Sequence, residues 1–389
     1  GDSMSACIAP FSFHNPTAIE FGMGALARLP ELVKNLGGKR ALVVGDPGVH
    51  KAGLVDRVIA ALGDDIPVIT FTEVESDPDA RSVDAGVKLA KPWNCDVIIG
   101  IGGGSAMDVA KAIGVMLTNP GNIRDYAGMG KISKPGVPVI AIPTTSGTGS
   151  EMTIWSVLSD REKNQKFGIG SILNCPRIAL LDPELTMSLP PAITAATGID
   201  ALTHALESYV NTTTQPISEA MSEQSMTLIA RSLRLAVMQP GNRQARADML
   251  LASTIAAMAF NSTRLGLVHA LAMPLGTRFH IPHGLVNAIM LPGVMRYNLP
   301  GSLAKFARIA QIFGEPIERL SLQQAAERSV SAIEKMKLDI GINARLSEFG
   351  MTESDLNDVA ADAMLSGNVP VNPRQPTLED IKTLLRAEL

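Results

Sequence analysis

Five short apolar runs between residues 40 and 182 constrain the fold of this chain more than any other feature. They occupy residues 41–44, 66–71, 96–100, 137–142 and 177–181, and stretches with helical periodicity separate them. Strands that alternate with helices form a parallel sheet, and such strands are apolar throughout because helices cover both faces of the sheet. The pattern predicts a doubly wound, Rossmann-like α/β domain, although periodicity alone does not separate these runs from short buried helices.

After residue 190 the apolar runs give way to long segments rich in Ala, Leu and Met. Pro190 and Pro191 mark the change, and a helix can start with a proline in its first turn. The predicted helices are 191–210, 216–237, 244–260, 285–297, 303–313, 321–338 and 377–388. A chain of 389 residues exceeds the usual size of a single core, so we predict an α/β domain over residues 1–190 and an all-α domain over residues 191–389.

Composition excludes several classes of partner. The formal net charge of -4 gives no basic surface for nucleic acid. No apolar run reaches the roughly 18 residues that span a bilayer, and no signal peptide is evident. Cys7, Cys95 and Cys175 are odd in number and form no CxxC pair, which favours a reducing compartment over a disulfide framework. We expect a soluble cytoplasmic protein without nucleic-acid or membrane partners, and we assign no function to residues 1–3.

Asp200 and His204 are four residues apart in a predicted helix, so their side chains project from the same face. The chain has only six histidines, and two others, His269 and His283, lie in a stretch rich in Gly and Pro. One carboxylate and three imidazoles are a plausible ligand set for a single divalent cation. Without sulfur, these ligands suit Fe(II), Zn(II), Mn(II), Ni(II) or Co(II) and do not choose among them.

The sequence between the two later histidines contains Pro274, Gly276 and Pro282. We expect these residues to break the helix there, which would let His269 and His283 converge. The alternative is that an Asp and a His face the same way by chance on an exposed helix. Four such residues beside Gly and Pro favour the metal site.

A glycine-rich loop, Gly102 to Ser105, joins a predicted strand to a predicted helix. Glycines at Gly103 and Gly104 let backbone N–H groups approach a pyrophosphate, and the helix N-terminus favours its negative charge. Because Ser105 occupies the last glycine position of G-x-G-x-x-G, the loop departs from that fingerprint. The alternative is a tight turn in which Ser105 and Asp108 form a capping box.

A second loop with small hydroxyl residues, 143–151, also follows a predicted strand. The carboxyl ends of parallel strands are where α/β sheets bind ligands, so this loop supports a nucleotide site. Asp46 follows the first run, where a carboxylate can accept hydrogen bonds from a ribose and repel a 2′-phosphate. This placement favours NAD(H) over NADP(H), although Asp46 can instead simply open the turn before Pro47 and Gly48.

With these residues the chain resembles the iron-containing (group III) alcohol dehydrogenase family, of the type that includes lactaldehyde reductase and 1,3-propanediol dehydrogenase. The resemblance runs nearly end to end. It rests on Gly-Gly-Gly-Ser at 102–105, Pro-Thr-Thr at 143–145 leading to Glu151, and the runs 196–205, 266–270, 282–284 and 372–374.

The resemblance implies a dehydroquinate synthase-like architecture: an N-terminal nucleotide-binding domain, a helical C-terminal domain and a metal in the cleft between them. It implies that the metal, Fe(II) or alternatively Zn(II), is held by Asp200, His204, His269 and His283. The residues that it places against NAD are Asp46, Gly103, Gly104, Ser105, Thr144, Thr145, Thr148, Thr153 and Lys166. The implied reaction is hydride transfer between the nicotinamide and a small alcohol or aldehyde whose oxygen the metal polarises.

The sequence departs from the family at two positions. Members usually carry a His four residues after the third ligand, and this chain has Met273 there. His280 is a candidate to replace it in proton transfer, so His269, His283 and His280 are the predicted catalytic residues; the alternative for His280 is an exposed loop residue. Arg264 stands where members often have a small residue, and it could bind an anionic group on the substrate or form a surface ion pair.

Two other functions compete with a dehydrogenase. One is a metal- and NAD-dependent lyase of the dehydroquinate synthase type, which would need more basic residues for its phosphorylated substrate than Arg264 provides. The other, suggested by Met273, is a protein that binds cofactor and metal without turnover. Whichever function applies, we expect a homo-oligomer, a dimer or larger.

Overall fold

The computed structural model of the chain describes residues 9–389, so Cys7 and residues 1–3 lie outside the described part. Two compact units make up the fold. The sheet unit comprises Pro16–Gly198 and Leu235–Ala257, and the helical unit comprises Ile199–Arg234, Met258–Leu389 and the described residues 9–15. Each unit therefore contains segments that are not contiguous in the sequence. The domain boundary that we place between residues 190 and 191 stays a prediction.

The sheet unit is built on six parallel strands. Their order is β1 (Ala18–Phe21), β9 (Ile178–Leu181), β6 (Val139–Pro143), β4 (Val97–Gly102), β2 (Ala41–Val44) and β3 (Val68–Phe71). The five apolar runs all form strands, as predicted. β1 was not predicted, because this edge strand is largely exposed and has no apolar run.

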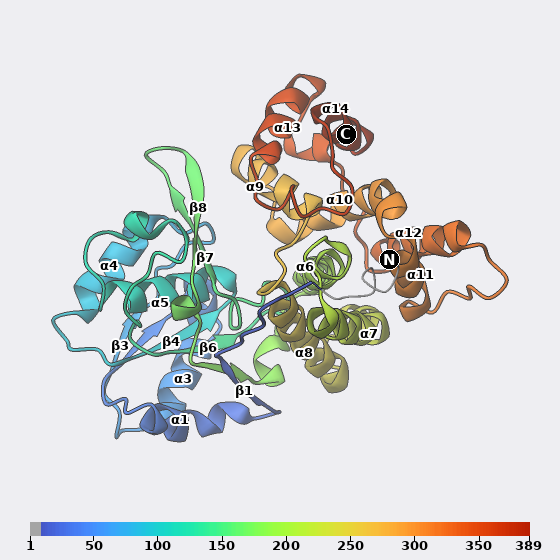
Figure 1. The fold of residues 1–389 in the computed structure, drawn as a ribbon. Helices are drawn as coiled ribbons and strands as arrows, with labels where there is room; N and C mark the ends of the chain where they lie inside the picture. The colour runs from blue at the N-terminus through green and yellow to red at the C-terminus, as the bar shows by residue number, and fades with distance from the viewer. Residues whose placement is uncertain (1–8) are drawn as a thin grey trace. The chain divides into compact units, whose positions relative to one another are not determined.

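Alternate residues of each central strand face opposite sides of the sheet, and both sides are buried. Val43 and Ile99 pack with residues of α1 (Leu29–Asn35) and α3 (Leu54–Leu62). Their neighbours Leu42 and Ile98 pack on the other side, with residues of α4 (Ala80–Ala90) and α5 (Gly104–Met116). Figure 1 shows these two helix pairs on opposite sides of the strands. The doubly wound α/β prediction is confirmed.

A second, three-stranded sheet was not predicted. It has the order β5 (Gly128–Met129), β8 (Gln165–Gly170) and β7 (Trp155–Asp160), and β7 and β8 form an antiparallel hairpin. The Trp155 ring packs over β8, where a Cβ on Gly170 would come within 2.6 Å of it. Both strands of the hairpin mix polar and apolar residues and contain no apolar run, which is why the sequence did not indicate it.

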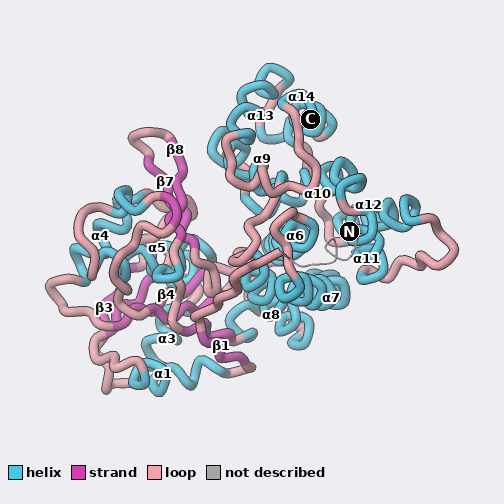
Figure 2. Tube along the Cα trace, viewed as in Figure 1, coloured by secondary structure: helices cyan, strands magenta, loops and turns pink. Residues whose placement is uncertain are grey.

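Residues 191–389 are all described and contain no strand, as Figure 2 shows by the absence of magenta there, so the all-α prediction is confirmed. The helices are α6 (Pro191–Val210), α7 (Pro216–Met238), α8 (Arg243–Phe260), α9 (Leu267–Phe279), α10 (His283–Asn298), α11 (Leu303–Ile312), α12 (Leu322–Asp339), α13 (Leu356–Met364) and α14 (Leu378–Ala387). None of the helices in the described residues is long and apolar enough to cross a membrane.

The predicted helix break at Pro274 and Gly276 is wrong. α9 continues through both residues to Phe279 and ends at His280, whose φ of 55° places it in the left-handed region. A proline inside a helix removes one backbone hydrogen bond but does not have to end the helix when tertiary packing supports it, and Pro274 is buried. The chain therefore turns at residues 280–282, and α10 begins directly at His283.

Candidate metal centre

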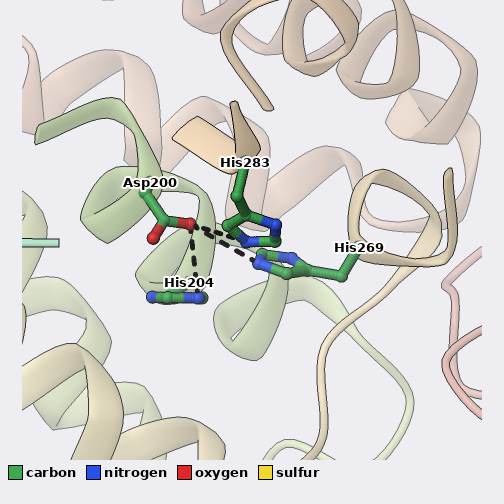
Figure 3. Close-up of side chains that lie close together, drawn as sticks. All are labelled: Asp200, His204, His269 and His283. Atoms are coloured by element: carbon green, nitrogen blue, oxygen red, sulfur yellow. Dashed lines mark ion pairs between the residues drawn. The ribbon is translucent and has the colours of Figure 1, made fainter. Parts of the chain in front are cut away.

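Three helices of the helical unit bring the four predicted ligands together. α6 carries Asp200 and His204, α9 carries His269 in its first turn, and α10 begins with His283. Asp200 Oδ1 lies 3.5 Å from Nε2 of His204, 3.8 Å from Nε2 of His269 and 3.1 Å from Nε2 of His283. All four ligand atoms lie within 4.8 Å of one another, and Figure 3 shows the three rings gathered around the carboxylate. This spacing allows one cation to contact all four.

Access to the cluster differs among its members. The side chains of Asp200, His204 and His269 are at most 7% exposed, whereas that of His283 is 45% exposed. A small molecule can therefore approach the cluster where His283 reaches the surface of the unit. The three buried members are shielded from solvent.

The buried polar atoms of the cluster fit a metal. Asp200 Oδ1 accepts a hydrogen bond of 2.6 Å from Asn287 Nδ2, which fixes the carboxylate. His269 Nδ1 lies 2.5 Å from Glu207 Oε1, whereas its other ring nitrogen, Nε2, is buried and has no hydrogen-bond partner among the described residues. A buried nitrogen without a partner is costly, and a divalent cation with mixed nitrogen and oxygen ligands would use its lone pair.

Charges around the cluster favour a cation. Burial lowers the pKa of His269, but the nearby carboxylates of Asp200 and Glu207 outweigh this effect and raise the pKa to about 9. Burial likewise raises the pKa of Asp200, but the three imidazoles hold it well below its usual value. The carboxylates of Asp200 and Glu207 thus both lie beside the His269 ring, and their negative charge favours a cation at this position.

Sequence analysis did not identify Glu207, which holds both the ring and the backbone of His269. Besides the ring nitrogen, its carboxylate accepts hydrogen bonds from Val268 N at 2.9 Å and His269 N at 3.3 Å, at the start of α9. A Cβ on Gly266 would lie 2.6 Å from Glu207 Oε2, so glycine is needed for this approach. The available signal was position, because Glu207 follows His204 by three residues on the same face of α6.

In the sheet unit, the two predicted nucleotide loops touch each other. Thr144 N donates a 2.9 Å hydrogen bond to Gly102 O. A Cβ on Gly104 would come within 2.9 Å of the Thr148 methyl group, and one on Gly103 would contact Thr145 at 3.7 Å. Both loops follow carboxyl ends of adjacent parallel strands, the position at which such sheets bind ligands.

The capping-box alternative for Ser105 and Asp108 is wrong. Gly103 is the N-cap of α5, and the Ser105 hydroxyl donates a 2.7 Å hydrogen bond to Ser76 O in another loop. The Asp108 carboxylate instead accepts hydrogen bonds from Ser150 Oγ and Val157 N. Tertiary partners outside the helix therefore replace the local cap.

Asp46 does open the turn at the start of α2 (Pro47–Lys51). Its Oδ1 accepts a 2.8 Å hydrogen bond from Val49 N, which caps that helix. The other oxygen, Oδ2, would lie 3.3 Å from a Cβ on Gly102, so the carboxylate sits beside the glycine-rich loop. The turn interpretation is confirmed, and Oδ2 is free of hydrogen bonds to described residues.

Thr153 and Lys166, the last two predicted cofactor residues, are both engaged with other side chains. The buried Thr153 hydroxyl accepts from Lys111 Nζ at 3.1 Å and donates to Trp155 O at 3.2 Å. Lys166 on β8 pairs with Asp77 Oδ1 at 3.6 Å. Both side chains therefore have partners within the sheet unit.

Comparisons with known proteins identify the family. A model described as iron-containing alcohol dehydrogenase matches residues 16–183, and one described as the C-terminal part of the Fe-containing alcohol dehydrogenase family matches residues 194–389. The chain belongs to the iron-containing alcohol dehydrogenase family. It is therefore an oxidoreductase, as the resemblance implies, and the family match favours this class over the lyase alternative.

Relatives in this family match nearly the whole chain. The 1,3-propanediol dehydrogenase of Klebsiella pneumoniae is 41% identical over 97% of this chain and 98% of its own. The NAD-dependent methanol dehydrogenase of Bacillus methanolicus is 37% identical over 97% of this chain and 100% of its own. A crystal structure of 1,3-propanediol oxidoreductase superposes with a TM-score of 0.96, covering 98% of this chain and 100% of that one at 41% identity. The sulfoacetaldehyde reductase of Bifidobacterium kashiwanohense, in complex with NAD+, has a TM-score of 0.89 at 32% identity and covers 98% and 99%.

Met273, His280 and Arg264, which the sequence singles out beside the metal ligands, are all exposed. Met273 lies one helical turn after His269 on α9 and is 36% exposed. His280 is exposed at the end of the same helix. Arg264 is also exposed, adopts a φ of 65°, and forms no ion pair with a described residue. Its guanidinium lies against Gly367, where a Cβ would come within 2.5 Å of Nη1.

Proposed function

We propose that this protein is a metal-dependent, NAD(H)-linked alcohol dehydrogenase or aldehyde reductase for a small primary alcohol or aldehyde. The observation that carries the proposal is the cluster of four ligand atoms, in which the buried Nε2 of His269 has no hydrogen-bond partner among the described residues. A structural cluster would pair such a nitrogen, whereas a metal site leaves it for the metal.

Asp200, His204, His269 and His283 would hold one divalent cation, Fe(II) by the family's description and Zn(II) as the alternative. Such an ion supplies Lewis-acid polarisation of an alcohol or aldehyde oxygen. Glu207 keeps the proton of the His269 ring on Nδ1, so that Nε2 presents a lone pair. Asn287 holds the Asp200 carboxylate in place, and the exposed side of His283 leaves room for the substrate.

NAD(H) would lie across the two touching loops of the sheet unit and supply the acceptor or donor of hydride. Gly103, Gly104 and Ser105 would meet the pyrophosphate, and Asp46 Oδ2 would accept from the adenosine ribose. Thr144, Thr145, Thr148, Thr153 and Lys166 complete the proposed contacts. The similarity to an NAD-dependent methanol dehydrogenase and to a reductase in complex with NAD+ supports this cofactor.

We also propose that an aldehyde with an anionic group is the preferred substrate, held by Arg264. Its exposed guanidinium has no carboxylate partner among the described residues, and it precedes His269 by five residues. Similarity to a sulfoacetaldehyde reductase supports an anionic substrate. The thioether of Met273 cannot carry a proton, so the substrate proton would pass to water or to His280.

The test is the absorbance of NADH during turnover by the Fe(II)-loaded protein with neutral and anionic aldehydes. We expect steady NADH oxidation, and we expect His269→Ala to lose bound metal and activity together. Net conversion without a change in NADH would indicate the lyase instead. Tight binding of metal and NADH without any turnover would indicate the binding protein. Light scattering of the same sample tests the proposed homo-oligomer, a dimer or larger.

A further inference from the structure

Lys111 is a buried charged residue that the proposed reaction does not use. It lies on α5, the helix that begins at Gly104, and it is 2% exposed. Burial lowers the pKa of its ammonium group, whereas the Asp108 carboxylate, 3.6 Å away on the preceding turn, raises this pKa. A buried lysine is costly unless its charge and its N–H groups have partners, so the partners of Lys111 indicate what the residue does.

Most partners of Lys111 lie in the segment that connects β6 with β7. The ammonium group donates to Ser150 O at 2.9 Å, Thr153 Oγ1 at 3.1 Å and Trp155 O at 2.7 Å. Residues 144–154 form neither helix nor strand, so no regular pattern of hydrogen bonds satisfies their backbone groups. Ser150 and Thr153 are buried, and buried carbonyl groups need a donor. Lys111 therefore stabilises the conformation of this loop.

Asp108 connects α5 to the same segment a second time. Its carboxylate accepts hydrogen bonds from Ser150 Oγ and from Val157 N, the latter at 3.1 Å. Asp108 precedes Lys111 by three residues, so both side chains project from one face of α5. This face of the helix thus binds the chain on both sides of Thr153.

Both segments that this network connects belong to the proposed nucleotide site. The amino end of α5 carries Gly104, and the loop held by Lys111 carries Thr148 and Thr153. A Cβ on Gly104 would come within 2.9 Å of the Thr148 methyl group. Because the two segments already meet this closely, a shift of the loop would change the space that is available to the pyrophosphate.

We propose that Lys111 and Asp108 are positioning residues that hold the loop of residues 144–155 against the amino end of α5 and thereby set the affinity for NADH. Lys111 does not need to touch the cofactor, since it acts through the backbone of the loop and the Thr153 hydroxyl. The inference rests on the proposed function, because the loop affects NADH only if the cofactor binds there. The four proposed metal ligands lie in the helical unit, so metal affinity should not depend on Lys111.

The test compares the Kd for NADH, measured by nicotinamide fluorescence, in the full chain and in three variants. Lys111→Met keeps an unbranched side chain but removes every donor, and we expect about tenfold weaker binding, the factor that corresponds to one hydrogen bond. Ser150→Ala removes only the hydroxyl group that donates to Asp108, and it should weaken NADH binding by a smaller factor. The KM for NADH should rise in both variants, whereas the Zn(II) affinity should stay at the wild-type value.

Asn119→Ala is the matched control. Asn119 is also buried, but it lies beyond the other end of α5, where its side chain donates to Lys134 O at 3.0 Å and accepts from Lys134 N at 3.1 Å. This variant should lower the melting temperature without changing the Kd for NADH.

An equal loss of NADH affinity in Asn119→Ala would show that stability alone sets the affinity, and it would overturn the inference. A wild-type Kd in Lys111→Met, or in Ser150→Ala if Lys111→Met does not fold, would overturn the inference and leave the proposed function standing. A wild-type protein that binds no NADH would refute the proposed function and the inference with it.

Discussion

Replacing Glu207 by Gln should weaken metal binding without unfolding the helical unit. The carboxylate accepts from His269 Nδ1, His269 N and Val268 N, and it is only 3% exposed. Glutamine has the same shape but only one accepting oxygen. If that oxygen faces the ring, the amide group faces the Val268 N–H and two donors meet. If the amide turns round, it donates to Nδ1 and moves the ring proton to Nε2, the atom needed by the metal.

The expected loss follows from these contacts. Hydrogen bonds to a charged group contribute about 1.5–3 kcal/mol each. Loss of a partner that orients a ligating imidazole lowers metal affinity by about 10–100-fold, which corresponds to about 1.4–2.7 kcal/mol. We therefore expect Glu207→Gln to weaken metal binding within this range and to lower the free energy of unfolding by a similar amount.

Asn372→Ala is the matched control, because Asn372 accepts from Leu267 N at the same helix start but makes no hydrogen bond to His269. Zn(II) affinity is measured by competition with a chromogenic chelator, and circular dichroism reports the fold. Glu207→Gln should lose affinity, whereas Asn372→Ala should lose only stability. Wild-type affinity in Glu207→Gln would refute the reasoning. An equal loss in Asn372→Ala would show that Glu207 acts only by capping α9.

Three further predictions concern the substrate and the cofactor. Arg264→Ala keeps the same backbone strain and should cost about 1.5–3 kcal/mol in kcat/KM for anionic aldehydes only; equal losses for neutral aldehydes of matched length would remove Arg264 from the site. Asp46→Gly should narrow the preference for NADH over NADPH, since it removes a negative charge facing the 2′-phosphate, and glycine costs only a few tenths of a kcal/mol as a helix cap. A wild-type protein that uses both cofactors equally well would contradict this role. Gly104→Ala should raise the Kd for NADH about tenfold, because the added methyl group overpacks against Thr148 at a cost of about 1–3 kcal/mol. In the Gly104→Ala protein, Thr148→Ser should restore part of the NADH affinity, because it removes the methyl group of Thr148. An unchanged Kd in Gly104→Ala would place the cofactor elsewhere.

The fold class could be predicted from the sequence because burial on both faces leaves a continuous apolar run. Each of the five runs became a strand of the parallel sheet. The β7–β8 hairpin and the edge strand β1 could not be predicted, because their strands mix polar and apolar side chains and form no continuous apolar run. For α9 the sequence suggested an interruption that does not exist. Pro274 predicts a helix break from local rules, but the helix continues through it because tertiary packing supports it.

For the candidate site, the sequence by itself determined the residue types and the pair Asp200 and His204, because the pitch of one helix places these two on one face. Only the tertiary structure decided that His269 and His283 meet them, since no local rule relates the ends of different helices. The structure also revealed the role of Glu207. In the sequence this residue looks like any other glutamate of a helix, and only its hydrogen bonds with the first turn of α9 distinguish it. The sequence determines which side chains are available, whereas contacts between segments far apart in the chain depend on how whole helices pack.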